Sequence, residues 1–295
     1  MSRTVIHALL ENLIDYAGLF PPAKLDMAPA VEEFARQRRS KHAWMLGRFV
    51  VPVGRLRELE AAAEPHWAVA EGAPWGLSVL VPGDLAEARQ RIDAFDARHR
   101  GRAVVEAIER QVATAEDVAA TLETFPGVEV YLEIPHQDDP SPLMAALSAH
   151  GARAKIRSGG VTAEAFPTVA EVARFIVSAG QAGIGFKATA GLHHPLRGEY
   201  RLTYEPDSPD GTMHGFLNVF LAAAWVDRDG MGQKDVEALL SERDPEAIKW
   251  ADAISWRGHT LDADGIAAAR KRFGSSYGSC SFQEPVSDLQ GLGIL

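Results

Sequence analysis

Short apolar runs alternate along this chain with longer segments in which apolar residues recur at helical spacing. Successive runs lie roughly 25 to 45 residues apart, which is the spacing of βα units. A helical extension over residues 1–44 precedes the first run. The runs predicted to be strands are 45–52, 75–83, 103–111, 128–135, 152–160, 183–191, 247–256 and 276–282.

Eight such units predict an α/β fold, a (β/α)8 or TIM barrel, as a single domain over residues 1–295. No sequence repeat, low-complexity tract or linker divides the chain. The sixth predicted strand is followed by a long loop, 192–215, rich in proline, glycine and aspartate. A loop of this length is typical of lids and binding loops.

Three further segments refine the prediction. Residues 216–225 are apolar on most sides and predict a buried helix, and residues 284–295 predict a short closing helix with proline in its first turn. The stretch DYAGLFPPAKL (15–25) is unusual for a helix end. We expect it to close one end of the barrel, where Asp15 or Tyr16 could reach the site.

Composition narrows the class of partner. The chain has 46% hydrophobic and 24% charged residues, enough for a large core, and a net charge of −10 that is spread along its length. Duplex nucleic acid and anionic membranes are therefore poor partners, and a small-molecule substrate is expected, with a homo-oligomer also open. The single cysteine, Cys280, excludes an internal disulfide and fits a cytoplasmic enzyme. No apolar run is long enough to span a membrane.

In a barrel of this kind the active site lies at the carboxyl ends of the strands, and each predicted strand ends in polar residues. The catalytic candidates are Glu109, Glu133, Lys155, Lys187, His193 and His194. The substrate-binding candidates are Arg48, Arg157, Thr189, Arg257, Ser279 and Ser281.

The two lysines carry the most specific chemistry. Side chains alternate along a strand, so Lys155 shares a face with Arg157, and Lys187 with Thr189. If these faces point inward, burial and the neighbouring cation should lower the pKa of one lysine and leave a neutral, nucleophilic amine. Lys187 is then expected to form a Schiff base with a carbonyl substrate, with Lys155 lowering its pKa or moving protons and Glu133 acting as acid or base.

The stretch FKATAG (186–191) is similar to the Lys-Thr-Ser-Thr-Gly signature of deoxyribose-phosphate aldolase. A barrel whose sixth strand ends in lysine resembles the class I aldolases, and the resemblance implies a Schiff-base role for Lys187. The threonines are out of phase with that signature. The second lysine is on the predicted fifth strand, where that family has its partner lysine on the seventh.

Two glycine-rich stretches, 273–282 and 158–160, have the composition of loops that bind an anion such as phosphate. Neither is a Walker or dinucleotide motif, because GxxxxGK[ST] is absent and no GxGxxG follows a strand. We therefore expect a lyase or aldolase-like enzyme that acts on a small oxygenated carbonyl compound, with or without phosphate, and that needs no cofactor.

Two alternatives remain open. His193 and His194 could join Glu109 and Glu133 as ligands of a divalent metal in a barrel lyase, isomerase or hydrolase, although no HExxH-like spacing supports this. The barrel could also bind a metabolite or serve as a scaffold without catalysis, with Lys187 and Glu133 as a buried ion pair.

Overall fold

The computed structural model describes residues 4–67 and 73–295, so residues 1–3 of the predicted extension lie outside it. Parallel strands close into a barrel in the order β1-β13-β7-β6-β5-β4-β3-β2. The predicted (β/α)8 barrel is confirmed. Its strands are β1 (Ile14–Tyr16), β2 (Leu46–Pro52), β3 (Trp75–Leu80), β4 (Ala103–Gln111), β5 (Glu129–Glu133), β6 (Arg153–Arg157), β7 (Phe186–Thr189) and β13 (Gly274–Ser279).

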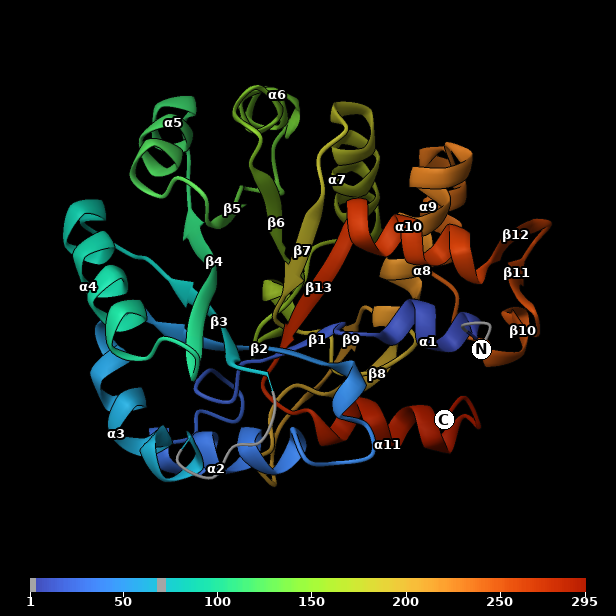
Figure 1. The fold of residues 1–295 in the computed structure, drawn as a ribbon. Helices are drawn as coiled ribbons and strands as arrows, with labels where there is room; N and C mark the ends of the chain where they lie inside the picture. The colour runs from blue at the N-terminus through green and yellow to red at the C-terminus, as the bar shows by residue number, and fades with distance from the viewer. Residues whose placement is uncertain (1–3, 68–72) are drawn as a thin grey trace.

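Helices surround this barrel (Figure 1). Thr114 and Thr168 each begin a helix with a capping box, in which side chain and backbone satisfy each other's free groups. The α-helices are α1 (Val5–Leu10), α2 (Met27–Gln37), α3 (Leu56–Trp67), α4 (Leu85–Arg98), α5 (Ala115–Thr124), α6 (Ser141–His150), α7 (Val169–Ala182), α8 (Phe216–Asp229), α9 (Gln233–Leu240), α10 (Ala263–Arg272) and α11 (Gln283–Gly291). The short 3-10 helices are η1 (Ala43–Met45), η2 (Val53–Arg55), η3 (Ala163–Ala165) and η4 (Pro245–Ala247).

The predicted buried helix and closing helix correspond to α8 and α11. Residues Phe216 to Trp225 of α8 are all buried. Within the described ranges, no helix is both long and apolar enough to cross a bilayer.

Two strand assignments from the sequence are wrong. The predicted seventh strand forms β10 (Lys249–Trp250) and β11 (Ala253–Trp256), which belong with β12 (His259–Asp262) to an antiparallel sheet outside the barrel. Arg257 and Gly258 make the two-residue turn between β11 and β12 with positive φ at both positions, as a tight hairpin requires.

The missing barrel strand lies within the predicted helical extension. Residues 14–16 form β1, which pairs with β13 on one side and β2 on the other. The true order therefore makes β6 the sixth and β7 the seventh barrel strand. The long loop follows the seventh strand and contains a hairpin of β8 (Gly198–Arg201) and β9 (Asp210–Met213).

The barrel separates apolar from polar side chains. Residues such as Phe49, Val79, Ile108 and Ile156 are buried in the hydrophobic core. Positions that alternate with them carry charged or hydroxyl groups, including Ser78, Glu109 and Lys155, and these side chains contact one another within the barrel. Barrel interiors are more often filled by layers of branched apolar residues, so this interior is unusually polar.

Two glycines make room for inward carboxylates at the amino-terminal ends of the strands. A Cβ at Gly47 would lie 2.3 Å from the Asp15 Oδ1 atom, and one at Gly76 would lie 2.7 Å from the Glu106 Cδ atom. The β3–β4 register also shifts beside Glu106, because Leu77 pairs with Val105 while Ser78 pairs with Ala107.

We expect Gly47→Ala to lower the free energy of unfolding by about 1–3 kcal/mol, because the added methyl displaces the buried Asp15 carboxylate. Gly54→Ala is the matched control, since a Cβ there meets no atom within 4 Å. Urea unfolding of both variants checks this. Equal midpoints would contradict the packing argument.

The buried His214, at the end of the long loop, predicts how the stability of the protein depends on pH. Its Nε2 donates to the Pro167 carbonyl at 2.7 Å, its Nδ1 lies 3.2 Å from the Arg197 guanidinium, and burial lowers its pKa from 6.5 to about 4. Between these values the unfolded state binds the proton more tightly, so stability falls as the pH falls from 6.5 to 4. His214→Gln should flatten this part of the stability profile in urea unfolding, whereas replacing the exposed His150 with Gln should not.

Candidate active site at the carboxyl ends of the strands

Both lysines named by the sequence point into the barrel. Lys155 on β6 and Lys187 on β7 are register partners on neighbouring strands. Lys187 is 0% exposed, and Lys155 is 5% exposed. The same cavity of about 610 Å³ at the carboxyl ends of the strands reaches both side chains.

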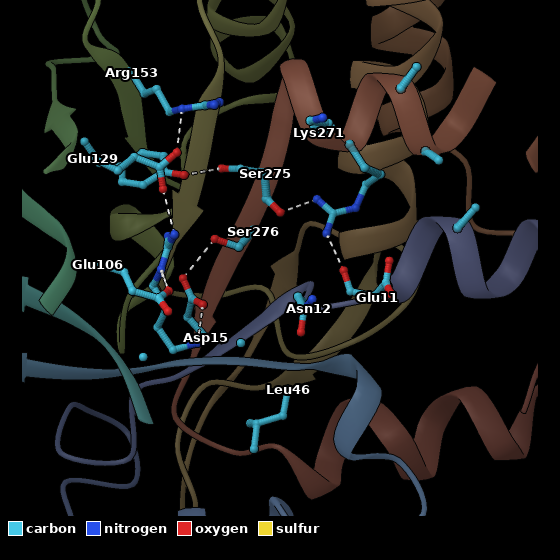
Figure 2. A pocket seen from close by; sticks show the side chains of 18 of the residues that line it. Glu11, Asn12, Asp15, Leu46, Glu106, Glu129, Arg153, Lys271, Ser275 and Ser276 are labelled. Atoms are coloured by element: carbon cyan, nitrogen blue, oxygen red, sulfur yellow. Dashed lines mark hydrogen bonds and ion pairs between the residues drawn. The ribbon is translucent and has the colours of Figure 1, made fainter. Parts of the chain in front are cut away.

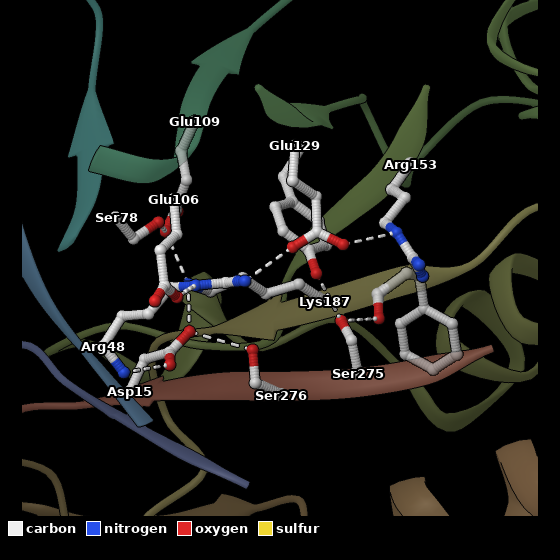
Figure 3. A network of polar contacts seen from close by, with 12 residues as sticks. Asp15, Arg48, Ser78, Glu106, Glu109, Glu129, Arg153, Lys187, Ser275 and Ser276 are labelled. Carbon is white, nitrogen blue, oxygen red and sulfur yellow. Dashed lines mark hydrogen bonds and ion pairs between the residues drawn. The ribbon is translucent and has the colours of Figure 1, made fainter. Parts of the chain in front are cut away.

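Lys187 is held between two buried carboxylates. Its Nζ atom lies 2.5 Å from the Asp15 Oδ2 atom and 2.6 Å from the Glu109 Oε1 atom. Asp15 also accepts from the Ser276 hydroxyl and the Arg48 backbone amide, and Glu109 accepts from the Ser78 hydroxyl at 2.6 Å. Figure 3 shows these contacts converging on Lys187.

This environment determines the charge of Lys187. Burial by itself would lower the pKa of Lys187, but the charges of Asp15 and Glu109 outweigh it and raise that pKa. The two lysines overcome the opposite effect of burial on Glu109 and hold its pKa well below the usual range. The expectation that Lys187 is a neutral amine is therefore wrong. The sequence indicated that Asp15 could reach the site, and the structure shows it there as a second carboxylate partner of Lys187.

Lys155 lies next to this cluster and lines the same cavity. Its Nζ atom is 2.9 Å from the Glu109 Oε2 atom and 2.9 Å from the Glu133 Oε2 atom. The other Glu133 oxygen lies 3.6 Å from the Arg157 Nε atom. The expected Lys187–Glu133 pair does not form. Lys187 instead pairs with Asp15 and Glu109, and Lys155 pairs with Glu109 and Glu133. The ion pairs form a continuous chain from Asp15 to Arg157.

Every barrel strand or its following loop contributes residues to the lining of this cavity. The lining residues are Ala17, Phe20, Pro21, Val50, Leu80, Val81, Pro82, Gly83, Glu109, Arg110, Gln111, Glu133, Lys155, Arg157, Gly160, Val161, Lys187, Thr189, Ala190, His193, Gly278 and Cys280. Of the twelve residues proposed from the sequence, the cavity therefore brings together Glu109, Glu133, Lys155, Arg157, Lys187, Thr189 and His193.

The adjacent histidines separate. His193 lines the cavity, and its Nδ1 atom is 3.0 Å from Glu284 of α11. His194 does not line it; its Nδ1 atom is 2.6 Å from Asp288, one turn further along α11. Within the described ranges, no group of three or more His, Cys, Asp or Glu residues is arranged to hold a metal ion. The proposed ligand set of two histidines and two glutamates is not assembled.

Four proposed binding residues do not line the cavity. Ser279 is buried and donates to the Ser281 carbonyl. Arg257 is in the β11–β12 turn outside the barrel, with its side chain 62% exposed. Arg48 lies two residues before Val50 on β2, so both side chains point inward. Val50 lines the carboxyl-terminal cavity, whereas Arg48 lies nearer the amino-terminal end of the strand and lines the cavity at the opposite end of the barrel.

Arg48 lines a second cavity of about 690 Å³ at the amino-terminal ends of the strands (Figure 2). Its guanidinium contacts Glu106 at 2.9 Å and Glu129 at 2.8 Å, and Glu129 also contacts Arg153 at 2.7 Å. Within this cavity, Arg48, Arg153, Glu106 and Glu129 are thus paired with one another. The amino-terminal face of a barrel usually serves stability, and these ion pairs fit that role.

Sequence reasoning missed three contributors to the carboxyl-terminal cavity or its support. Ser78 and Ser276 each donate to a buried carboxylate, and Arg110 donates from Nη1 to the Val81 and Gly83 carbonyls. The inward alternation of β3 was a usable signal for Ser78. Nothing in the local pattern marked Ser276.

We expect Lys187→Met to lower the free energy of unfolding by about 3–5 kcal/mol, because it leaves the buried Asp15 carboxylate without its lysine and Glu109 with Lys155 alone. Lys249→Met is the control, since the Lys249 side chain is 65% exposed. Thermal and urea unfolding measure both. A Lys187→Met protein as stable as the control would show that the cluster does not need this cation.

Comparison with known proteins assigns no family to the chain. No protein-family model matches the sequence, and no curated protein matches it. Its chemistry is therefore inferred from its own side chains.

Proposed function

We propose that this protein is a lyase of the aldolase type that binds a small oxygenated carbonyl compound as a Schiff base on Lys155. The observation that carries the proposal is that Lys155 lines the cavity with its amine 2.9 Å from a carboxylate oxygen of Glu133. The Lys155 amine, the Glu133 carboxylate as proton carrier and the exposed Arg157 guanidinium then lie together in a concave site.

Lys155 is a better nucleophile candidate than Lys187. Lys187 has a raised pKa, is 0% exposed and lies 2.5 and 2.6 Å from its two carboxylates. Lys155 is 5% exposed, and its two carboxylate contacts are longer, at 2.9 Å each. Lys155 is on the sixth barrel strand and Lys187 on the seventh. The strand positions support this choice, because the aldolases named above have their Schiff-base lysine on the sixth strand and its partner lysine on the seventh. The FKATAG similarity itself surrounds Lys187, on the seventh strand.

The proposed chemistry uses residues of this chain alone. Glu133 accepts a proton from the Lys155 ammonium, and the resulting amine attacks the substrate carbonyl carbon. Glu133 returns the proton to the new hydroxyl, which leaves as water and yields the protonated imine. The protonated imine then accepts the electron pair of the bond between the α- and β-carbons as that bond breaks, while Glu133 takes the proton of the β-hydroxyl, so that the β-carbon leaves as a carbonyl compound. Glu133 returns this proton to the α-carbon of the remaining enamine, and water hydrolyses the resulting imine to release the second product and the Lys155 amine. Lys187 remains an ammonium that keeps Glu109 ionised below the site.

The metal-dependent alternative receives no support from a particular observation. Its four proposed ligands are engaged elsewhere, with Glu109 on both lysines and the histidines on Glu284 and Asp288. A noncatalytic barrel differs from the proposed lyase in one measurable way, because it forms no covalent bond with a carbonyl compound.

Borohydride reduction in the presence of pyruvate, glycolaldehyde or glyceraldehyde tests the proposal. We expect mass spectrometry to find the reduced adduct on Lys155. The amount of adduct should fall at least ten-fold in Lys155→Met and stay unchanged in Lys249→Met. Labelling confined to exposed lysines, or equal in the two variants, would refute the Schiff base. A label on Lys187 would refute the choice of Lys155.

A further inference from the structure

The mouth of the carboxyl-terminal cavity has two chemically distinct sides. The neighbouring strands β1, β2 and β3 and their loops contribute apolar groups, which we call the apolar side: Ala17, Phe20, Pro21, Val50, Leu80, Val81 and Pro82. The neighbouring strands β4 to β7 contribute the charged side: Glu109, Arg110, Glu133, Lys155, Arg157 and Lys187.

Part of the apolar side is accessible. Phe20 and Leu80 are only partly buried, and Pro21 and Pro82 are exposed at the rim. Apolar surface in a concave site favours a ligand that covers it, because water leaves both surfaces.

Arg157 is the cation on the charged side that is available to a ligand. Its side chain is 55% exposed, and its ion pair with Glu133 is long, at 3.6 Å. Lys155 and Lys187 make shorter contacts with carboxylates, and Arg110 donates to two backbone carbonyls. A planar guanidinium binds a carboxylate through paired hydrogen bonds.

The spacing of Lys155 and Arg157 limits where the anionic group can be in the substrate. They are two positions apart on one strand, so their Cα atoms are about 6.6 Å apart on the same face. The two oxygens of Glu133 reach both side chains. A carbonyl carbon at Lys155 and an anionic group at Arg157 must therefore be close neighbours in the molecule.

The cavity is also too large for a small carbonyl compound alone. Its volume of about 610 Å³ is well within the range of sites for larger small molecules. A three-carbon substrate at Lys155 would leave the apolar side uncovered.

We infer that the substrate is a 2-oxo carboxylate with an apolar alkyl or aryl body. Its carboxylate contacts Arg157, its carbonyl carbon faces Lys155, and its body covers Phe20, Leu80 and Pro82. The covalent step rests on the proposed function, but the recognition of a carboxylate joined to an apolar body does not. A singly charged carboxylate is assigned in preference to phosphate because one exposed cation, Arg157, is available to neutralise it.

Calorimetry with phenyllactate and lactate tests recognition without imine formation, because neither compound has a ketone. We expect phenyllactate to bind at least ten-fold more tightly than lactate. Arg157→Gln and Leu80→Asp should each weaken phenyllactate binding ten-fold or more. The controls are Arg257→Gln and Val104→Asp, because both residues are exposed and neither lines this cavity. Both control variants should bind phenyllactate like the unchanged protein.

The same proteins are then reduced with borohydride in phenylpyruvate or pyruvate. Selective phenyllactate binding without any Lys155 adduct would uphold the recognition and refute the Schiff base. Equal binding of phenyllactate and lactate, or variants that bind like their controls, would overturn the inference even if Lys155 is labelled by pyruvate. Tighter binding of phenyl phosphate than of phenyllactate would overturn the carboxylate assignment.

Discussion

The contact between the Lys187 ammonium and the carboxylates of Asp15 and Glu109 is the interaction on which the barrel interior depends. It joins β7 to β1 and β4 across the barrel, with no exposure of the lysine. Burial of each of these charges alone would be costly, so all three must be retained together. The hydroxyls of Ser78 and Ser276 and the backbone amide of Arg48 complete the hydrogen bonds of the two carboxylates.

This cluster also determines which groups are available for chemistry. Because Lys187 is committed to Asp15 and Glu109, the second lysine, Lys155, is left as the amine that faces the cavity beside Glu133. The charged side of the cavity is continuous with the buried cluster. The apolar side is formed by β1, β2 and β3, which contribute Asp15, Ser78 and the Arg48 backbone amide to the cluster but no charged side chain to the cavity lining. The two-sided character of the mouth is thus a consequence of where the interior charges are paired.

The apolar and polar pattern predicted much of this arrangement. Seven of the eight barrel strands were predicted from the runs along the sequence. The period-two alternation placed Lys155 with Arg157 and Lys187 with Thr189, and the structure shows that both lysines are buried in the barrel interior. The pattern failed at β1, because three residues are too few to display an alternation, and at residues 247–256, because an apolar strand in an antiparallel hairpin has the same local pattern as one in a barrel.

The sequence by itself determined the barrel class, the inward lysines and the carboxylates on neighbouring strands, because these follow from spacing along one segment of chain. Only the tertiary structure decided which charges meet. Asp15 and Lys187 are 172 residues apart, and a strand count in error by one hides their proximity. The ion pairs, and hence the protonation of Lys187, depend on distances across the closed barrel, and no local pattern of side chains encodes those distances.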